Sequence, residues 1–269
     1  MKASMQPEEN SVHADIHHDV PVYDRFRGTG PTLVFLHYWG GSGRTWNLVF
    51  DHLGDRDRLA VDFRGWGRSH TLPGPFTLDH YASDVLAVIG DAGIEQYVLV
   101  GHSMGGKVAQ LVGARRPAGL RGLVLVAPAP AVPSRQITAE YQRHLAHAYD
   151  TADSVAGVRD TVLTSARLSD ELRAQVVEDS RASATGARDE WPLRGIGEDI
   201  ADRTRLVSVP TLVIGGEHDR VEPVEVLHEN LLPYLKTAES VVVPGAGHLL
   251  PLEAPTQLSG LIREFVVRV

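Results

Sequence analysis

The segment Gly101–Gly105, with the sequence GHSMG, constrains the fold of this chain more than any other. It follows an apolar run at 97–100 that predicts a buried strand, and it precedes a segment at 106–112 that predicts a helix. A strand, a G-x-S-x-G sequence and a helix together form a sharp turn that lifts the serine oxygen above a sheet. The glycines of such a turn let neighbouring backbone pass closely. The context therefore predicts that Ser103 stands at the carboxyl end of a strand.

Short apolar runs alternate with helical patterns along most of the chain. The runs that predict strands are 20–23, 32–36, 58–61, 97–100, 123–127, 211–214 and 240–243, and the clearest further helical patterns are 78–89 and 255–269. This alternation predicts the α/β class, with a mostly parallel central sheet flanked by helices.

The alternation stops between Pro128 and Arg205, where Ala-, Arg- and Glu-rich stretches predict helices and no comparable apolar strand occurs. We therefore expect a helical cap at 131–205, inserted into a core formed by 20–130 and 206–269. The cap should cover the carboxyl edge of the sheet, where open α/β folds place their sites. Segment 1–19 is expected to be partly flexible or to form an edge strand.

Composition excludes several classes of function. The net charge of −8 argues against a nucleic-acid surface and against an anionic membrane surface. The chain has no cysteine, so it can form neither a disulfide nor a thiolate metal site. Its beginning lacks the apolar core of a signal peptide, and no run approaches the length of a membrane span. These features predict a cytoplasmic protein with a small-molecule substrate, and they leave its oligomeric state open.

A serine hydroxyl needs a neighbouring base, and the base needs an orienting carboxylate. Asp219 follows the predicted strand at 211–214, and His248 follows the predicted strand at 240–243. The order serine, acid, histidine is that of the α/β-hydrolase arrangement. Glu217 competes with Asp219 for the role of the acid.

At this point the chain resembles the capped α/β-hydrolase superfamily, the group of serine esterases, haloperoxidases and epoxide-hydrolase-like enzymes. The resemblance extends from about Val20 onward and depends on five motifs. These are Leu36-His37, DFRGWGRS at 62–69, GHSMGG at 101–106, GEHD at 216–219 and GHLLPLEAP at 247–255. It implies an α/β-hydrolase fold with Ser103 as the nucleophile, His248 as the base and Asp219 as the orienting acid.

The resemblance also implies an oxyanion hole made by the backbone N–H groups of Met104 and Trp39. Family members usually have a glycine where this chain has Tyr38. The Tyr38 side chain either forms a wall of the pocket, which we favour, or donates its hydroxyl to the oxyanion. The expected pocket residues are His37, Tyr38, His102 and Trp191.

The sequence thus predicts a serine hydrolase that cleaves a small ester, thioester or lactone through an acyl-enzyme, without a metal or organic cofactor. The same triad could instead perform C–C bond hydrolysis, perhydrolysis or cofactor-free dioxygenation, or it could belong to a ligand-sensing protein with slow turnover. His13, His17 and His18 lack partners at metal-ligand spacing, so we expect no metal site there.

Overall fold

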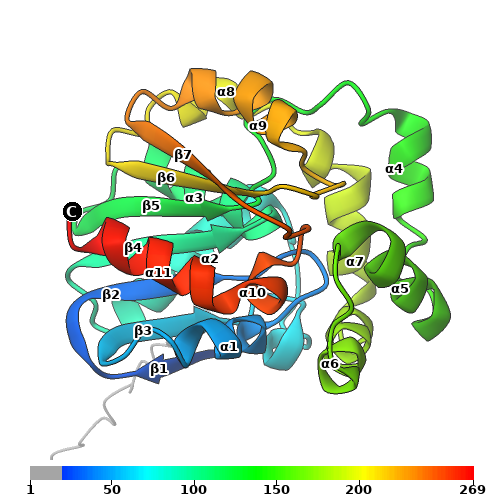
Figure 1. Cartoon of the computed structure of the whole chain (residues 1–269), viewed down its shortest axis with the longest axis horizontal. Coiled ribbons are helices and arrows are strands. Elements are labelled where there is room, and N and C mark those ends of the chain that lie inside the picture. The colour runs from blue at the N-terminus through cyan, green and yellow to red at the C-terminus, as the bar shows by residue number, and fades with distance from the viewer. Residues whose placement is uncertain (1–19) are drawn as a thin grey trace, which may run out of the picture.

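A sheet of seven strands forms the centre of residues 20–269, which are the residues that the computed structural model describes (Figure 1). The strand order is β1-β3-β2-β4-β5-β6-β7, and every neighbouring pair is parallel except β1 with β3. The bounds are Tyr23–Phe26 (β1), Thr29–Leu36 (β2), Arg56–Val61 (β3), Tyr97–His102 (β4), Leu120–Val126 (β5), Thr211–Gly216 (β6) and Ala238–Val243 (β7). The predicted α/β class with a mostly parallel sheet is confirmed.

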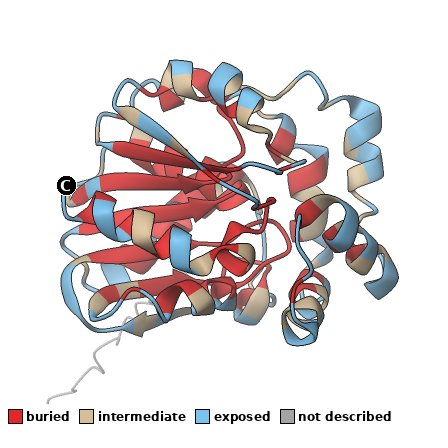
Figure 2. Cartoon of the chain, in the orientation of Figure 1, coloured by how far each residue is buried: buried red, intermediate tan, exposed pale blue. Residues whose placement is uncertain are grey.

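The central strands are apolar along their whole length because helices cover both faces of the sheet. Every residue of β4 and β6 is buried, whereas the edge strands β1 and β7 are only partly buried (Figure 2). Successive side chains of a strand point to opposite faces. Accordingly, Leu99 of β4 packs in one apolar cluster with Val85, and its neighbour Val98 packs in a second cluster with Ile262.

These two clusters define a layer of helices on each face. Helices α2 (Leu78–Asp91), α3 (Met104–Ala114), α8 (Ala201–Thr204) and α9 (Val224–Asn230) contribute to the first cluster or pack beside it, and α1 (Asn47–Phe50), α10 (Leu250–Glu253) and α11 (Pro255–Val266) contribute to the second. Short 3₁₀ turns occur at Gly43–Trp46, Gly67–Ser69, Gly195–Gly197 and Leu232–Tyr234.

Between β5 and β6 the chain leaves the sheet and forms a separate group of helices, which we call the insertion. Its helices are α4 (Ala139–Leu145), α5 (Ala152–Val158), α6 (Asp170–Arg181) and α7 (Thr185–Leu193), with a π-helical turn at Arg159–Leu163. Thr138, Thr151 and Ser169 begin three of them by accepting a hydrogen bond from a first-turn N–H group. In Figure 1 these helices lie beyond the carboxyl ends of the strands. The domain limits at 131 and 205 stay a prediction, and segment 1–19 lies outside the described residues.

The order of the strands points to the place of a site. The chain adds β3 on one side of β2 and adds β4 to β7 on the other side, so the direction of winding changes between β2 and β4. Ligands of open α/β sheets bind at such a switch point, beyond the carboxyl ends of the strands. The loop after β2 and the turn after β4 therefore meet where a ligand is expected.

Candidate active site

Ser103 occupies a strained turn between β4 and α3. Its backbone has φ +53° and ψ −116°, a conformation that residues other than glycine rarely adopt. The neighbouring glycines make the turn possible, because a Cβ at Gly101 would lie 2.4 Å from the Gly105 oxygen. A Cβ at Gly105 would in turn lie 2.6 Å from the His37 oxygen. The predicted strand, turn and helix are thus present, with the serine at the carboxyl end of β4.

The structure brings Ser103, His248 and Asp219 together in one hydrogen-bonded chain. Ser103 Oγ lies 2.9 Å from His248 Nε2, and His248 Nδ1 lies 2.9 Å from Asp219 Oδ2. All three residues are buried. Since the carboxylate can only accept, Nδ1 carries the proton and Nε2 is free to accept from the serine hydroxyl. This is the arrangement that a nucleophilic serine requires.

The turn after β6 holds Asp219 in its charged form. Its Oδ1 accepts hydrogen bonds from the N–H groups of Val221 (2.8 Å) and Glu222 (3.0 Å). Burial alone would raise the pKa of Asp219, but the charge and hydrogen bond of His248 and these N–H groups outweigh it, so the pKa lies below 3.8. Glu217, the competing acid, is half-exposed and accepts from the Gly245 N–H instead.

The oxyanion hole expected from the N–H groups of Trp39 and Met104 stays a prediction, and the structure gives the positions of both residues. Met104 follows Ser103, and Trp39 lines the same cavity as Ser103. Neither backbone N–H has an acceptor among residues 20–269. The Trp39 ring stacks on Tyr149 of the insertion at 4.0 Å between centroids, and the Tyr149 hydroxyl donates to the Trp39 oxygen. The backbone of this loop is therefore fixed from the insertion side.

Tyr38 fits beside Ser103 because the same loop provides room three residues later. The Gly41 N–H donates to the Tyr38 oxygen, and a Cβ at Gly41 would lie 2.6 Å from the Tyr38 ring. Tyr38 is buried and lines the cavity, and its hydroxyl has no hydrogen-bond partner within the described part of the chain. Burial raises the pKa of Tyr38 well above 10, so the hydroxyl stays protonated.

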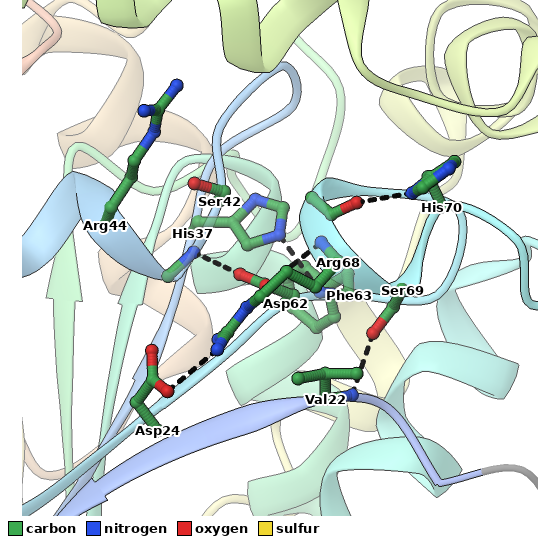
Figure 3. Close-up of polar contacts among 12 residues, drawn as sticks. Val22, Asp24, His37, Ser42, Arg44, Asp62, Phe63, Arg68, Ser69 and His70 are labelled. Atoms are coloured by element: carbon green, nitrogen blue, oxygen red, sulfur yellow. Dashed lines mark hydrogen bonds and ion pairs between the residues drawn. The ribbon is translucent and has the colours of Figure 1, made fainter.

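His37 lies beneath the loop rather than in the cavity, which corrects the expectation for its side chain. Its Nε2 accepts from the Phe63 N–H at 3.0 Å (Figure 3), so the proton is on Nδ1. The Nδ1–H group donates to the Tyr38 oxygen at 2.7 Å. Burial lowers the pKa of His37 to about 4, so it is neutral. Asp62 accepts from the Gly43 N–H at 2.6 Å, so Asp62 holds the loop after β2 in place.

His102 also lies outside the lining of the cavity, contrary to expectation. Its Nε2 donates to the backbone oxygen of His248 at 2.8 Å, and its Nδ1 has no partner among the described residues. Burial, followed by the charge of His248, lowers the pKa of His102 to about 3. His102 therefore supports the loop that carries His248.

The cavity above Ser103 is small and mostly apolar, with a volume of about 50 Å³. The insertion supplies most of its wall: Tyr141, Leu145, Tyr149, Val158, Val162, Leu163, Trp191 and Ile196. Tyr38 and Trp191, both expected in the pocket, do line it. A second cavity of about 240 Å³ is lined by Met104 and shares Trp191 with the first. The space around Ser103 thus suits a small or slender group.

Three residues near the site were not predicted from the sequence. Glu222 and Tyr149 line the cavity, and Asp179 of α6 accepts from Ser42 Oγ (3.0 Å) and Arg44 Nε (2.9 Å) in the loop after β2. Burial raises the pKa of Asp179 to about 6, although Arg44 and Ser42 act in the opposite direction. Of these three residues, only Glu222 could have been suspected from the sequence, because it follows Asp219 by three positions.

Within residues 20–269, no three histidine, aspartate or glutamate side chains gather as ligands for a metal ion. His13, His17 and His18 lie outside the described residues. In the same range, no helix is both long enough and apolar enough to cross a membrane.

A mostly parallel sheet with a serine on a strained strand-to-helix turn is the architecture of α/β-hydrolase-type enzymes. The model of the alpha/beta hydrolase family matches residues 33–260. The chain therefore belongs to the alpha/beta hydrolase family, which is a family of enzymes.

Known proteins resemble the chain over most of its length. A pimeloyl-[acyl-carrier protein] methyl ester esterase of Yersinia enterocolitica is 30% identical over 249 residues, which cover 87% of this chain and 92% of that protein. A non-heme haloperoxidase of Rhodococcus erythropolis is 29% identical over 245 residues, covering 82% and 86%. The solved structure of a thermophilic esterase of Thermogutta terrifontis is 26% identical, with a TM-score of 0.76 and coverage of 92% and 93%. Hydrolases and esterases are therefore prominent among its relatives.

Proposed function

We propose that this protein is a serine hydrolase that cleaves a small ester, thioester or lactone through an acyl-enzyme. The observation that carries the proposal is the unbroken hydrogen-bonded chain from Ser103 through His248 to Asp219, with distances of 2.9 Å at both links. Ser103 lines the cavity together with Trp39, and the N–H groups of Trp39 and of Met104, which follows Ser103, have no acceptor among the described residues.

Acylation begins at the serine hydroxyl. His248 Nε2 takes the proton as Ser103 Oγ forms a bond to the carbonyl carbon, and Asp219 stabilises the imidazolium. The negative charge on the carbonyl oxygen is met by the N–H groups of Met104 and Trp39. The carbon–oxygen or carbon–sulfur bond then breaks, and His248 returns the proton to the leaving group.

Water completes the reaction. His248 Nε2 takes a proton from the water as its oxygen attacks the acyl carbon, and the same oxyanion contacts stabilise the second tetrahedral intermediate. The bond to Ser103 Oγ breaks, the serine regains its proton and the acid leaves. Every step uses side chains, backbone N–H groups and water, so no cofactor takes part in the proposal.

The walls of the cavity support a small substrate. The apolar side chains of the insertion, which we propose acts as a cap, favour a neutral or moderately apolar acyl or alcohol group. The names of the relatives support an ester, since two of the three proteins described above are esterases.

The proposal is tested with an active-site-directed fluorophosphonate. We expect the reagent to label one residue, Ser103, and we expect Ser103→Ala to lose both labelling and hydrolysis of short aryl esters, because only an activated hydroxyl attacks such a reagent quickly. Intact-mass spectrometry gives the readout. Labelling or turnover that persists in Ser103→Ala would refute the proposal.

A further inference from the structure

Glu222 is a buried carboxyl group in the wall of the cavity, and the mechanism above does not use it. Glu222 is 6% exposed and lines the cavity together with Ser103 and His248. Its backbone N–H donates to Asp219 Oδ1, which fixes the start of its side chain beside the proposed triad. The carboxyl oxygens themselves have no hydrogen bond or ion pair within residues 20–269, and they keep a little accessible surface rather than being fully enclosed.

A carboxyl group in this position is costly to the fold. Buried polar groups in folded proteins are almost always hydrogen-bonded, and an isolated buried carboxylate is strongly disfavoured. Burial, and then the negative charge of Asp219, raise the pKa of Glu222 well above 4.5. Among the described residues only the charge of Lys107 offsets this cost, and only in part, so a purely structural role does not account for the residue.

Lys107 is the cation whose charge acts on Glu222, but its ammonium group donates a hydrogen bond elsewhere. It is fully buried in α3, and its Nζ donates to the backbone oxygen of Glu198 at 2.5 Å. Its charge lowers the pKa of Glu222, but the two groups form no ion pair among the described residues. The Glu222 carboxyl is thus left facing the cavity without an internal partner.

We propose that Glu222 is a specificity-determining residue that binds a hydrogen-bond donor of the substrate, either a hydroxyl or a protonated amine. This inference rests on the proposed function, because it assigns the substrate class of the same cavity. The other walls are largely apolar, so a donor that enters has few competing acceptors. An amine would also offset the charge of the carboxylate, whereas a hydroxyl would exchange hydrogen bonds with either form of the group.

The test compares esters that differ in one terminal group. We use p-nitrophenyl esters of the acids X–CH₂–CH₂–COOH, where X is methyl, methoxy, hydroxyl or ammonium, and a parallel series of acetate esters with X on the alcohol. The value of kcat/KM for each X is divided by that for methyl. This ratio removes any general effect of a variant on the triad.

Three variants separate the possible sources of selectivity. Glu222→Gln keeps an acceptor oxygen but removes the charge, and Glu222→Met removes both at similar size. Glu225→Gln is the matched control, because Glu225 is exposed in the first turn of α9 and does not line the cavity. The wild-type protein should favour hydroxyl or ammonium over methyl by about 10- to 100-fold in one series. A preference for hydroxyl should disappear in Glu222→Met only. A preference for ammonium should disappear in both Glu222→Gln and Glu222→Met. Glu225→Gln should keep the preference of the wild-type protein.

Thermal unfolding gives a second readout. We expect Glu222→Met to raise Tm, by about 2 °C or more, because it removes a buried group that lacks a partner. A lower Tm together with unchanged ratios would assign Glu222 a structural role and overturn the inference. A preference for methoxy would also overturn it, because methoxy cannot donate. Turnover in Ser103→Ala is a separate outcome, which refutes the proposed function itself.

Discussion

The two halves of the cavity are built in different ways. The half formed by the sheet places Ser103, Asp219 and His248 at the ends of β4, β6 and β7, and continuous hydrogen bonds fix each side chain. The half formed by the insertion consists mainly of apolar side chains, which pack on one another and on the loop after β2. At the cavity the halves meet where Trp39 stacks on Tyr149 and where the Leu163 oxygen accepts from the His248 N–H at 3.0 Å.

This difference separates chemistry from substrate choice. Strand register determines where the proposed triad stands, and a parallel sheet allows that register little variation. Helices of the insertion are held by side-chain packing, which tolerates changes of size and shape when volume is conserved. Changes in the sheet half should therefore reduce kcat strongly, whereas changes in the insertion half should alter selectivity or stability.

The largest effect is expected for the nucleophile and its base. Ser103→Ala and His248→Ala should each lower kcat by about 10⁴-fold or more, and the double variant should lose little beyond either single one, because the two residues act as a unit. Steady-state hydrolysis of a short aryl ester measures all three. If the two losses multiply, Ser103 and His248 are not coupled, and the sheet half does not work as one unit.

The orienting acid gives the next largest effect. Asp219→Asn should lower kcat by roughly 10³- to 10⁴-fold, because the amide no longer fixes the imidazole with its proton on Nδ1. Glu217→Gln is the matched control and should stay within about twofold, since Glu217 is half-exposed and bonds to Gly245 rather than to His248. If Glu217→Gln lowered kcat more than Asp219→Asn, Glu217 would be the orienting acid.

Asp179 tests how the insertion is attached to the loop after β2. Its pKa of about 6, against an ordinary value of 3.8, means that the folded protein binds a proton more tightly than the unfolded chain. Stability from this group is therefore present below about pH 4 and is lost as pH rises through about 6. The difference corresponds to roughly 3 kcal/mol at most.

The variant Asp179→Asn keeps the shape of the side chain but does not titrate. We expect the wild-type Tm minus the Asp179→Asn Tm to fall as pH rises from 4 to 7 and to level off above it. The other groups near Asp179, which are Arg44, Glu178 and Asp62, are present in both proteins and largely cancel. A difference that rises with pH would show that pairing with Arg44 outweighs burial.

The same contrast between the halves governs what the sequence could predict. Ser103, Asp219 and His248 could be predicted because each follows an apolar strand within a few residues. The local sequence pattern therefore places each of them at the end of a strand. His37 and His102 also follow such strands, but a pattern of residue types does not tell which way a side chain turns. His102 faces the His248 loop, and His37 faces Phe63.

The arrangement of the insertion was harder to predict from the sequence, for a physical reason. Periodicity predicts that a segment is helical, but the docking of a helix depends on contacts with residues far away in the sequence. Tyr149 meets Trp39, and Asp179 meets Ser42, across more than 100 residues in each case. The role proposed for Glu222 depends on its carboxyl group having no hydrogen bond or ion pair within residues 20–269, which only the surrounding structure reveals.

The smallest effect is expected at Tyr38, where the two halves meet. Its ring is held over Gly41 and lies 5.2 Å from the His102 ring, so phenylalanine preserves the packing. In the proposed mechanism the N–H groups of Trp39 and Met104 supply two donors for the oxyanion, so that mechanism does not need the hydroxyl. Tyr38→Phe should therefore change kcat by less than about threefold, as expected for a group that makes no contact specific to the transition state.

This outcome separates the two roles left open for Tyr38. A hydrogen bond from the Tyr38 hydroxyl to the oxyanion would form only in the transition state. Loss of the hydroxyl would therefore lower kcat by about 10²-fold with little change in KM. Steady-state kinetics of Tyr38→Phe, with circular dichroism to verify the fold, distinguish these cases. A large loss of kcat would assign Tyr38 to the oxyanion hole, and the loop after β2 would then contribute a side chain to the chemistry as well as backbone.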